Sequence, residues 1–169
     1  MSSNYDIVCA ENTSLEEARF NRTFNVDPVF KVLGRELSTD DRGVLQVDLS
    51  LVEALWIVKV FRKLRIDAIP VRKKSLDSFI SFDSAKRITE EYLAQIKIRR
   101  PSLGLMQVVE RELPWPLSKL AYGFFSASEE MRAEGASPPG MTICIDRFTG
   151  TVMDERMLLE IELMQMLTE

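Results

Sequence analysis

The hydrophobic periodicity of this chain changes near Pro101, and that change constrains the fold more than any other feature. Before it, residues 51–65 and 84–98 carry apolar side chains at three- and four-residue spacing, as amphipathic helices do. After it, three stretches alternate in polarity or concentrate aromatic residues, which is typical of β-strands. These stretches are residues 105–112, 120–125 and 141–146. The sequence therefore predicts an α+β fold, with an antiparallel sheet and flanking helices in the C-terminal half.

The N-terminal half is predicted to be mainly helical, with one or two short strands. Ser50 and Glu53 form an S-x-x-E capping box directly before the apolar run of the helix at 51–65. A further helix is expected over residues 15–24, after a capping Thr13 or Ser14. We treat residues 1–82 as an N-terminal segment and 83–169 as an α+β domain. One continuous domain is the alternative.

The stretch 141–146 shows the clearest strand pattern. Met141, Ile143 and Ile145 share one face, which we predict to point into the core. The turn at 149–150 is expected to lead into a short strand at 151–153 that pairs back. Cys144 lies on the opposite face, and we expect a buried, inert thiol there rather than a nucleophile.

The absence of histidine from all 169 residues excludes several kinds of chemistry. Serine and cysteine triads, histidine general bases and His-containing metal sites all require an imidazole. Two cysteines are too few for a zinc cluster, and no glycine-rich phosphate loop occurs. Glu110 and Glu112 flank Arg111 on one strand face, which we expect to be exposed surface. We therefore predict no enzyme activity, no catalytic residue, no metal and no cofactor.

The charge is unevenly distributed along a chain whose net charge is −4. Residues 59–100 carry 12 basic and five acidic side chains, whereas residues 1–58 carry five basic and ten acidic ones. A nucleic-acid partner is not favoured, because the whole chain is acidic and Phe61 is the one aromatic residue within the basic run from Lys59 to Lys74.

Two acidic loops are the candidate partner-binding sites. Loops on a rigid sheet commonly carry recognition residues, and acidic side chains steer association with basic partners. The first loop holds Asp40 and Asp41, and the second holds Glu129, Glu130 and Glu134.

The C-terminal helix, expected over residues 154–167, carries apolar residues on more than one stripe. A helix wedged between the two halves of the protein would explain this pattern. An exposed stripe that binds a second copy or another partner would explain it as well. The sequence is compatible with both the wedged helix and the exposed binding stripe.

The N-terminus lacks the basic and apolar regions of a secretory signal, and no apolar run approaches the length of a transmembrane helix. With only two cysteines in addition, we expect a cytoplasmic protein without a membrane partner.

Three segments resemble one family. They are the helix Ile88–Leu93, the aromatic strand Ala121–Ser126 and the hairpin Ile143–Val152, whose sequence is I-C-I-D-R-F-T-G-T-V. Together they resemble the YrhB-like immunity domains of bacterial polymorphic-toxin systems, over residues 83–168. The resemblance implies a non-catalytic cytoplasmic protein that binds and neutralises a cognate toxin. A small acidic chaperone or interaction adaptor that acts as a dimer is the alternative.

Overall fold

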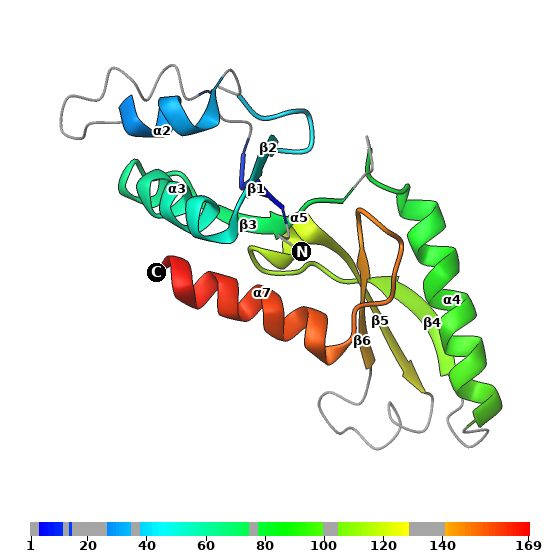
Figure 1. The fold of residues 1–169 in the computed structure, drawn as a ribbon. Coiled ribbons are helices and arrows are strands. Elements are labelled where there is room, and N and C mark those ends of the chain that lie inside the picture. The colour runs from blue at the N-terminus through cyan, green and yellow to red at the C-terminus, as the bar shows by residue number, and fades with distance from the viewer. Residues whose placement is uncertain are drawn as a thin grey trace. The chain divides into compact units, whose positions relative to one another are not determined.

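The computed structural model describes residues 4–11, 14, 27–34, 38–74, 78–99, 105–128 and 141–169 (Figure 1). The chain divides into two compact units. The first unit comprises Met1–Ser75 and Leu159–Glu169, and the second comprises Leu76–Leu158. The sequence-based prediction placed the boundary between residues 82 and 83 and assigned all of residues 83–169 to one domain. The structural units instead assign the last 11 residues to the first unit.

The first unit is built on a three-stranded antiparallel sheet in the order β2-β1-β3. Its strands are β1 (Tyr5–Cys9), β2 (Val44–Leu49) and β3 (Ala68–Arg72), and its helices include α2 (Asp27–Leu33) and α3 (Leu51–Lys63). The prediction of a mainly helical N-terminal half is therefore corrected, because a sheet organises this unit. The helix expected over 15–24 lies outside the described residues.

The burial of the central strand, β1, explains why the sequence did not predict the sheet of the first unit. All five residues of β1 are buried. A strand covered on both faces shows a short apolar run without alternation, and periodicity cannot assign such a run.

Helix α3 begins where its capping box predicts. The Ser50 hydroxyl accepts a hydrogen bond from the Glu53 amide, and the Glu53 carboxylate accepts one from the Ser50 amide at 2.9 Å. The buried face of α3, which includes Ile57 and Phe61, contributes to the core of this unit together with residues of β1 and β3. Capping and burial together account for the helix.

Asp6 is a buried carboxylate that serves the irregular pairing of β1 with β2. The register shifts between Tyr5 and Ile7, and Asp48 has a positive φ of 54°. Asp6 is 6% exposed, and its Oδ1 accepts hydrogen bonds from the amides of Val47 (3.1 Å) and Asp48 (3.3 Å). The carboxylate thus replaces the strand partners that the irregularity removes.

Replacing Asp6 by alanine should lower the free energy of unfolding by about 2 kcal/mol, because two amides lose their acceptor. Asp6→Asn is the matched control, since its amide oxygen can still accept, and it should cost clearly less. Urea denaturation of both variants measures the difference. Equal losses for Asn and Ala would show that acceptance by Asp6 does not stabilise this pairing.

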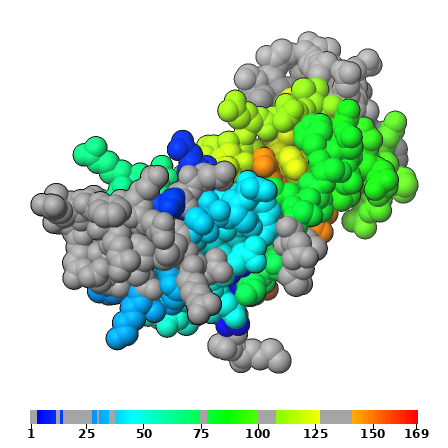
Figure 2. Space-filling model, turned by 90° about the horizontal axis from the view of Figure 1, so that it is seen from above, coloured from blue at the N-terminus to red at the C-terminus, as the bar shows by residue number. Residues whose placement is uncertain are grey.

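The second unit contains another three-stranded antiparallel sheet, in the order β4-β5-β6. Its elements are α4 (Phe82–Arg99), β4 (Leu105–Glu110), α5 (Leu117–Leu120), β5 (Ala121–Ser128) and β6 (Met141–Asp146). Helix α4 packs on this sheet, and in Figure 2 its green side chains form an outer surface of the unit. The predicted antiparallel sheet with a flanking helix is confirmed.

The core of the second unit lies between α4 and the sheet. Ala85 and Leu93 of α4 cluster there with Phe124, Ile143 and Ile145, all less than 5% exposed. Met141 packs against the same cluster, so the inward face predicted for β6 is confirmed.

The turn after β6 also follows its prediction. The Asp146 carboxylate accepts a hydrogen bond from the Phe148 amide at 2.8 Å, and Gly150 adopts a positive φ of 70°. The chain then returns, and Val152 forms an antiparallel bridge with Ile145. An aspartate that accepts from the following amides, and a glycine in the left-handed region, are what such a turn requires.

Candidate functional site

Helix α7 (Glu155–Thr168) presents two apolar stripes. One of them is partly buried: Ile161 is half-buried, and Met164 packs against the core of the first unit. The other is exposed and consists of Leu159 (54%), Leu163 (47%), Met166 (63%) and Leu167 (52%). We call these four residues the α7 stripe. Their spacing of four, three and one residues places them on one helix face.

An ion pair joins α7 to β3 within the first unit. Arg72 Nε lies 2.8 Å from Glu160 Oε1, and the Glu160 carboxylate raises the pKa of Arg72. Both side chains are exposed, so the pair contributes little stability. The packing of Met164 against the core of the unit turns the α7 stripe outward.

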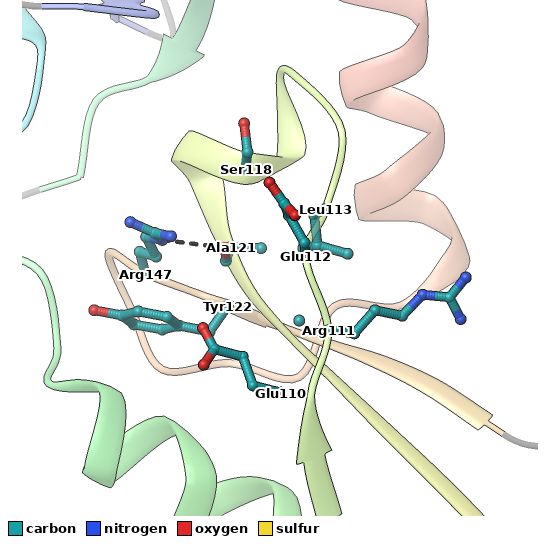
Figure 3. Close-up of a pocket in the computed structure, with 9 residues that line it drawn as sticks. Glu110, Arg111, Glu112, Leu113, Ser118, Ala121, Tyr122 and Arg147 are labelled. Atoms are coloured by element: carbon teal, nitrogen blue, oxygen red, sulfur yellow. Dashed lines mark hydrogen bonds between the residues drawn. The ribbon is translucent and has the colours of Figure 1, made fainter.

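A half-open cavity of about 530 Å³ lies in the second unit (Figure 3). It is formed by the end of β4, the segment 111–118, the start of β5 and the turn after β6. Its lining residues are Glu110, Arg111, Glu112, Leu113, Ser118, Ala121, Tyr122, Gly123 and Arg147. This volume is within the range of small-molecule sites.

Arg147 is held in place on one side of the cavity. Its Nε donates a hydrogen bond to the Ala121 carbonyl at 3.1 Å, and its guanidinium lies 4.4 Å from the centre of the Tyr122 ring. The Phe79 ring centre is 5.7 Å away. Burial lowers the pKa of Arg147, against the opposing effects of Tyr122 and Glu110. The cation is therefore oriented and partly removed from water.

The neighbouring side chains have distinct orientations. The Tyr122 hydroxyl donates to the Ile80 carbonyl at 2.9 Å, which holds the ring beneath Arg147. In Figure 3 the Glu110 side chain extends to the same side of the strands as Tyr122, and Glu112 lies beside Ser118. Both glutamates are exposed, as predicted. Arg111 points away from Tyr122 in this view and donates to the Thr142 hydroxyl at 2.7 Å.

Asp40, one of the predicted partner-binding residues, is engaged within its own loop. Its carboxylate accepts hydrogen bonds from the Arg42 side chain (2.8 Å) and from the Val44 amide (3.0 Å). Burial acts to raise the pKa of Asp40, but these hydrogen bonds and one from Gln46 outweigh it and lower the pKa. Asp40 therefore stabilises the loop.

Asp41, the next residue, is exposed, and the segment that carries it, cyan in Figure 2, reaches the molecular surface. The other predicted residues, Glu129, Glu130 and Glu134, lie outside the described residues. Binding of a partner by these five carboxylates stays a prediction.

The described residues present no arrangement that matches a familiar catalytic or metal site. Cys144 is buried, and burial raises the pKa of its thiol despite the opposing charge of Arg111. Among the residues that the structure describes, no three His, Cys, Asp or Glu side chains converge to hold a metal ion. No helix in this part of the chain is long and apolar enough to span a bilayer.

Comparison with known family models, curated proteins and solved structures found no match to this chain. The family resemblance of residues 83–168 therefore stays a hypothesis. The sequence analysis missed Tyr122 and Arg147, which lie 25 positions apart. The register of β5 and β6 pairs Ala121 with Asp146 and so makes the two side chains neighbours. Aligning the two predicted strands as a hairpin is the signal that would have found them.

Proposed function

We propose that this chain is a non-catalytic protein-binding protein whose contact surface includes the α7 stripe. The observation that carries the proposal is the exposure of four large apolar side chains on one face of a helix. A contiguous exposed apolar face is typical of protein–protein interaction sites. Helical anchors at this spacing are also a common mode of recognition.

The finer proposal is that the partner is a bacterial toxin and that the chain acts in the cytoplasm as its immunity protein. The resemblance of residues 83–168 to immunity domains supports it. The net charge of −4 supports it as well, because an acidic inhibitor associates faster with a basic toxin. Exposed carboxylates such as Asp41 would contribute to that steering.

A dimeric chaperone or interaction adaptor is the second candidate, because the α7 stripe offers a surface on which two copies of the chain could pair. The mass in solution, measured by light scattering after size-exclusion chromatography, separates the two. A monomer of 19.4 kDa favours the immunity protein, and a stable dimer favours the adaptor.

The test replaces Leu163 and Met166 together by lysine. We expect the double variant to keep the wild-type melting temperature, because both side chains are exposed. Its affinity for the partner should fall by about 100-fold, since two apolar anchors become charged. If a neighbouring gene encodes a toxin module, that module is the partner to assay, with rescue of bacterial growth and binding kinetics as readouts. Ile98→Lys on α4, where Ile98 is 79% exposed, is the matched control.

Loss of rescue in the stripe variant, with rescue retained by Ile98→Lys, would support the proposal. Full rescue by both variants would remove the α7 stripe from the interface. Failure of the wild-type chain to neutralise or bind the module would refute the immunity function.

A further inference from the structure

The cavity of the second unit contains a cation whose outer donors are unused. Arg147 donates through Nε to Ala121, but no described residue accepts a hydrogen bond from its two terminal nitrogens. No carboxylate lies within ion-pair distance of Arg147 in the described chain. A guanidinium oriented in this way presents paired donors that match the two oxygens of a carboxylate.

Two carboxylates and a second cation, Arg111, also line the cavity. Glu110 and Glu112 both line it and are both exposed, so neither is committed to a buried partner. Arg111 points away and bonds Thr142, which leaves Arg147 as the cation directed at Tyr122. A purely anionic ligand would be repelled by the two glutamates, and a purely cationic one by Arg147. A ligand that carries one charge of each sign suits both.

We propose that this cavity binds a free α-amino acid, with its carboxylate on the terminal nitrogens of Arg147 and its ammonium group toward Glu110 and Glu112. The volume of about 530 Å³ accommodates a ligand of this size. Tyr122 holds the Arg147 guanidinium in position, because its ring stacks on the guanidinium and its hydroxyl donates a hydrogen bond to the Ile80 carbonyl. This binding is independent of the α7 stripe, which lies in the other unit.

The experiment titrates each of the 20 common L-amino acids into the ¹⁵N-labelled full-length protein, up to about 10 mM. At least one of them should shift the amide resonances of Ala121, Tyr122 and Arg147 in a saturable manner. Acetate and methylammonium, which each carry one of the two charges, should bind at least about ten-fold more weakly.

Variants assign the binding to the named groups. Arg147→Gln should weaken binding by about ten-fold or more. Arg87→Gln on α4, which makes the same change in charge at an exposed position outside the cavity lining, should leave it unchanged. Glu110→Gln, at an exposed position, is the second variant if Arg147→Gln does not fold, and it should weaken binding several-fold.

Three outcomes would overturn the proposal. The first is the absence of saturable shifts with all 20 amino acids. The second is acetate binding as tightly as the best amino acid, which would indicate a site for adventitious anions. The third is unchanged affinity in folded Arg147→Gln, or in Glu110→Gln where that variant stands in for it.

Discussion

Replacing Ile143 by aspartate is expected to lower the melting temperature of the second unit by about 10 °C or more. Ile143 is 4% exposed and packs with Phe124 and Leu93 between the sheet and α4. The variant removes apolar contacts and also places a carboxyl group where no partner is available, which together cost about 4 kcal/mol or more. For a chain of this length such a loss corresponds to roughly that change in melting temperature.

Thr142→Asp is the matched control for that change. Thr142 precedes Ile143 on the same strand but is exposed, and its hydroxyl accepts a hydrogen bond from Arg111. An aspartate there remains hydrated and has a cation beside it, so its melting temperature should stay within a few degrees of the wild type. Calorimetry of both variants gives the comparison. Equal melting of Ile143→Asp and the wild type would show that Ile143 does not face the core.

Replacing Gly123 by alanine should lower the free energy of unfolding by about 2–4 kcal/mol. A Cβ atom at this position would lie 2.5 Å from the Arg111 carbonyl oxygen and 2.6 Å from Leu113 Cγ. Because this oxygen belongs to the backbone, the clash can be relieved only if the segment after β4 moves away from β5. That movement would stretch the hydrogen bond from the Arg111 amide to the Gly123 carbonyl, now 2.8 Å.

A double variant separates the two sources of the clash. Leu113→Ala removes the side-chain atoms but leaves the Arg111 carbonyl in place, so it should recover part of the stability lost in Gly123→Ala. Urea denaturation of the two single variants and the double variant measures the coupling. A Gly123→Ala protein as stable as the wild type would contradict the close approach of these two segments.

Gly123 also connects stability with the cavity. The close approach that it permits places the segment 111–113 against β5, and this segment brings Glu112 and Leu113 to the cavity wall. We therefore expect Gly123→Ala to weaken amino-acid binding as well, because the wall of the cavity would shift. The α7 stripe belongs to the other unit, so its binding should persist in that variant.

The sequence by itself determined the elements whose signals are local. Ser50 and Glu53 marked the start of α3 through neighbouring backbone groups, and the alternation of 141–146 identified the inner face of β6. Asp146 and Gly150 defined the turn for the same reason, since the turn needs only residues within a few positions. Capping, alternation and turn chemistry all act over short distances along the chain, so they are visible without the fold.

Only the tertiary structure decided the features that depend on distant partners. β1 is recognisable as a strand because β2 and β3 pair with it, and its burial on both faces removes the alternation that would have revealed it. Which stripe of α7 is exposed depends on the core that receives Met164. The cavity likewise exists because strand pairing brings Tyr122 beside Arg147 and because Gly123 admits the segment that carries Glu112. Periodicity can show that a segment has a buried face, but it does not show which distant segment pairs with it or packs against it, so these features emerged only from the folded chain.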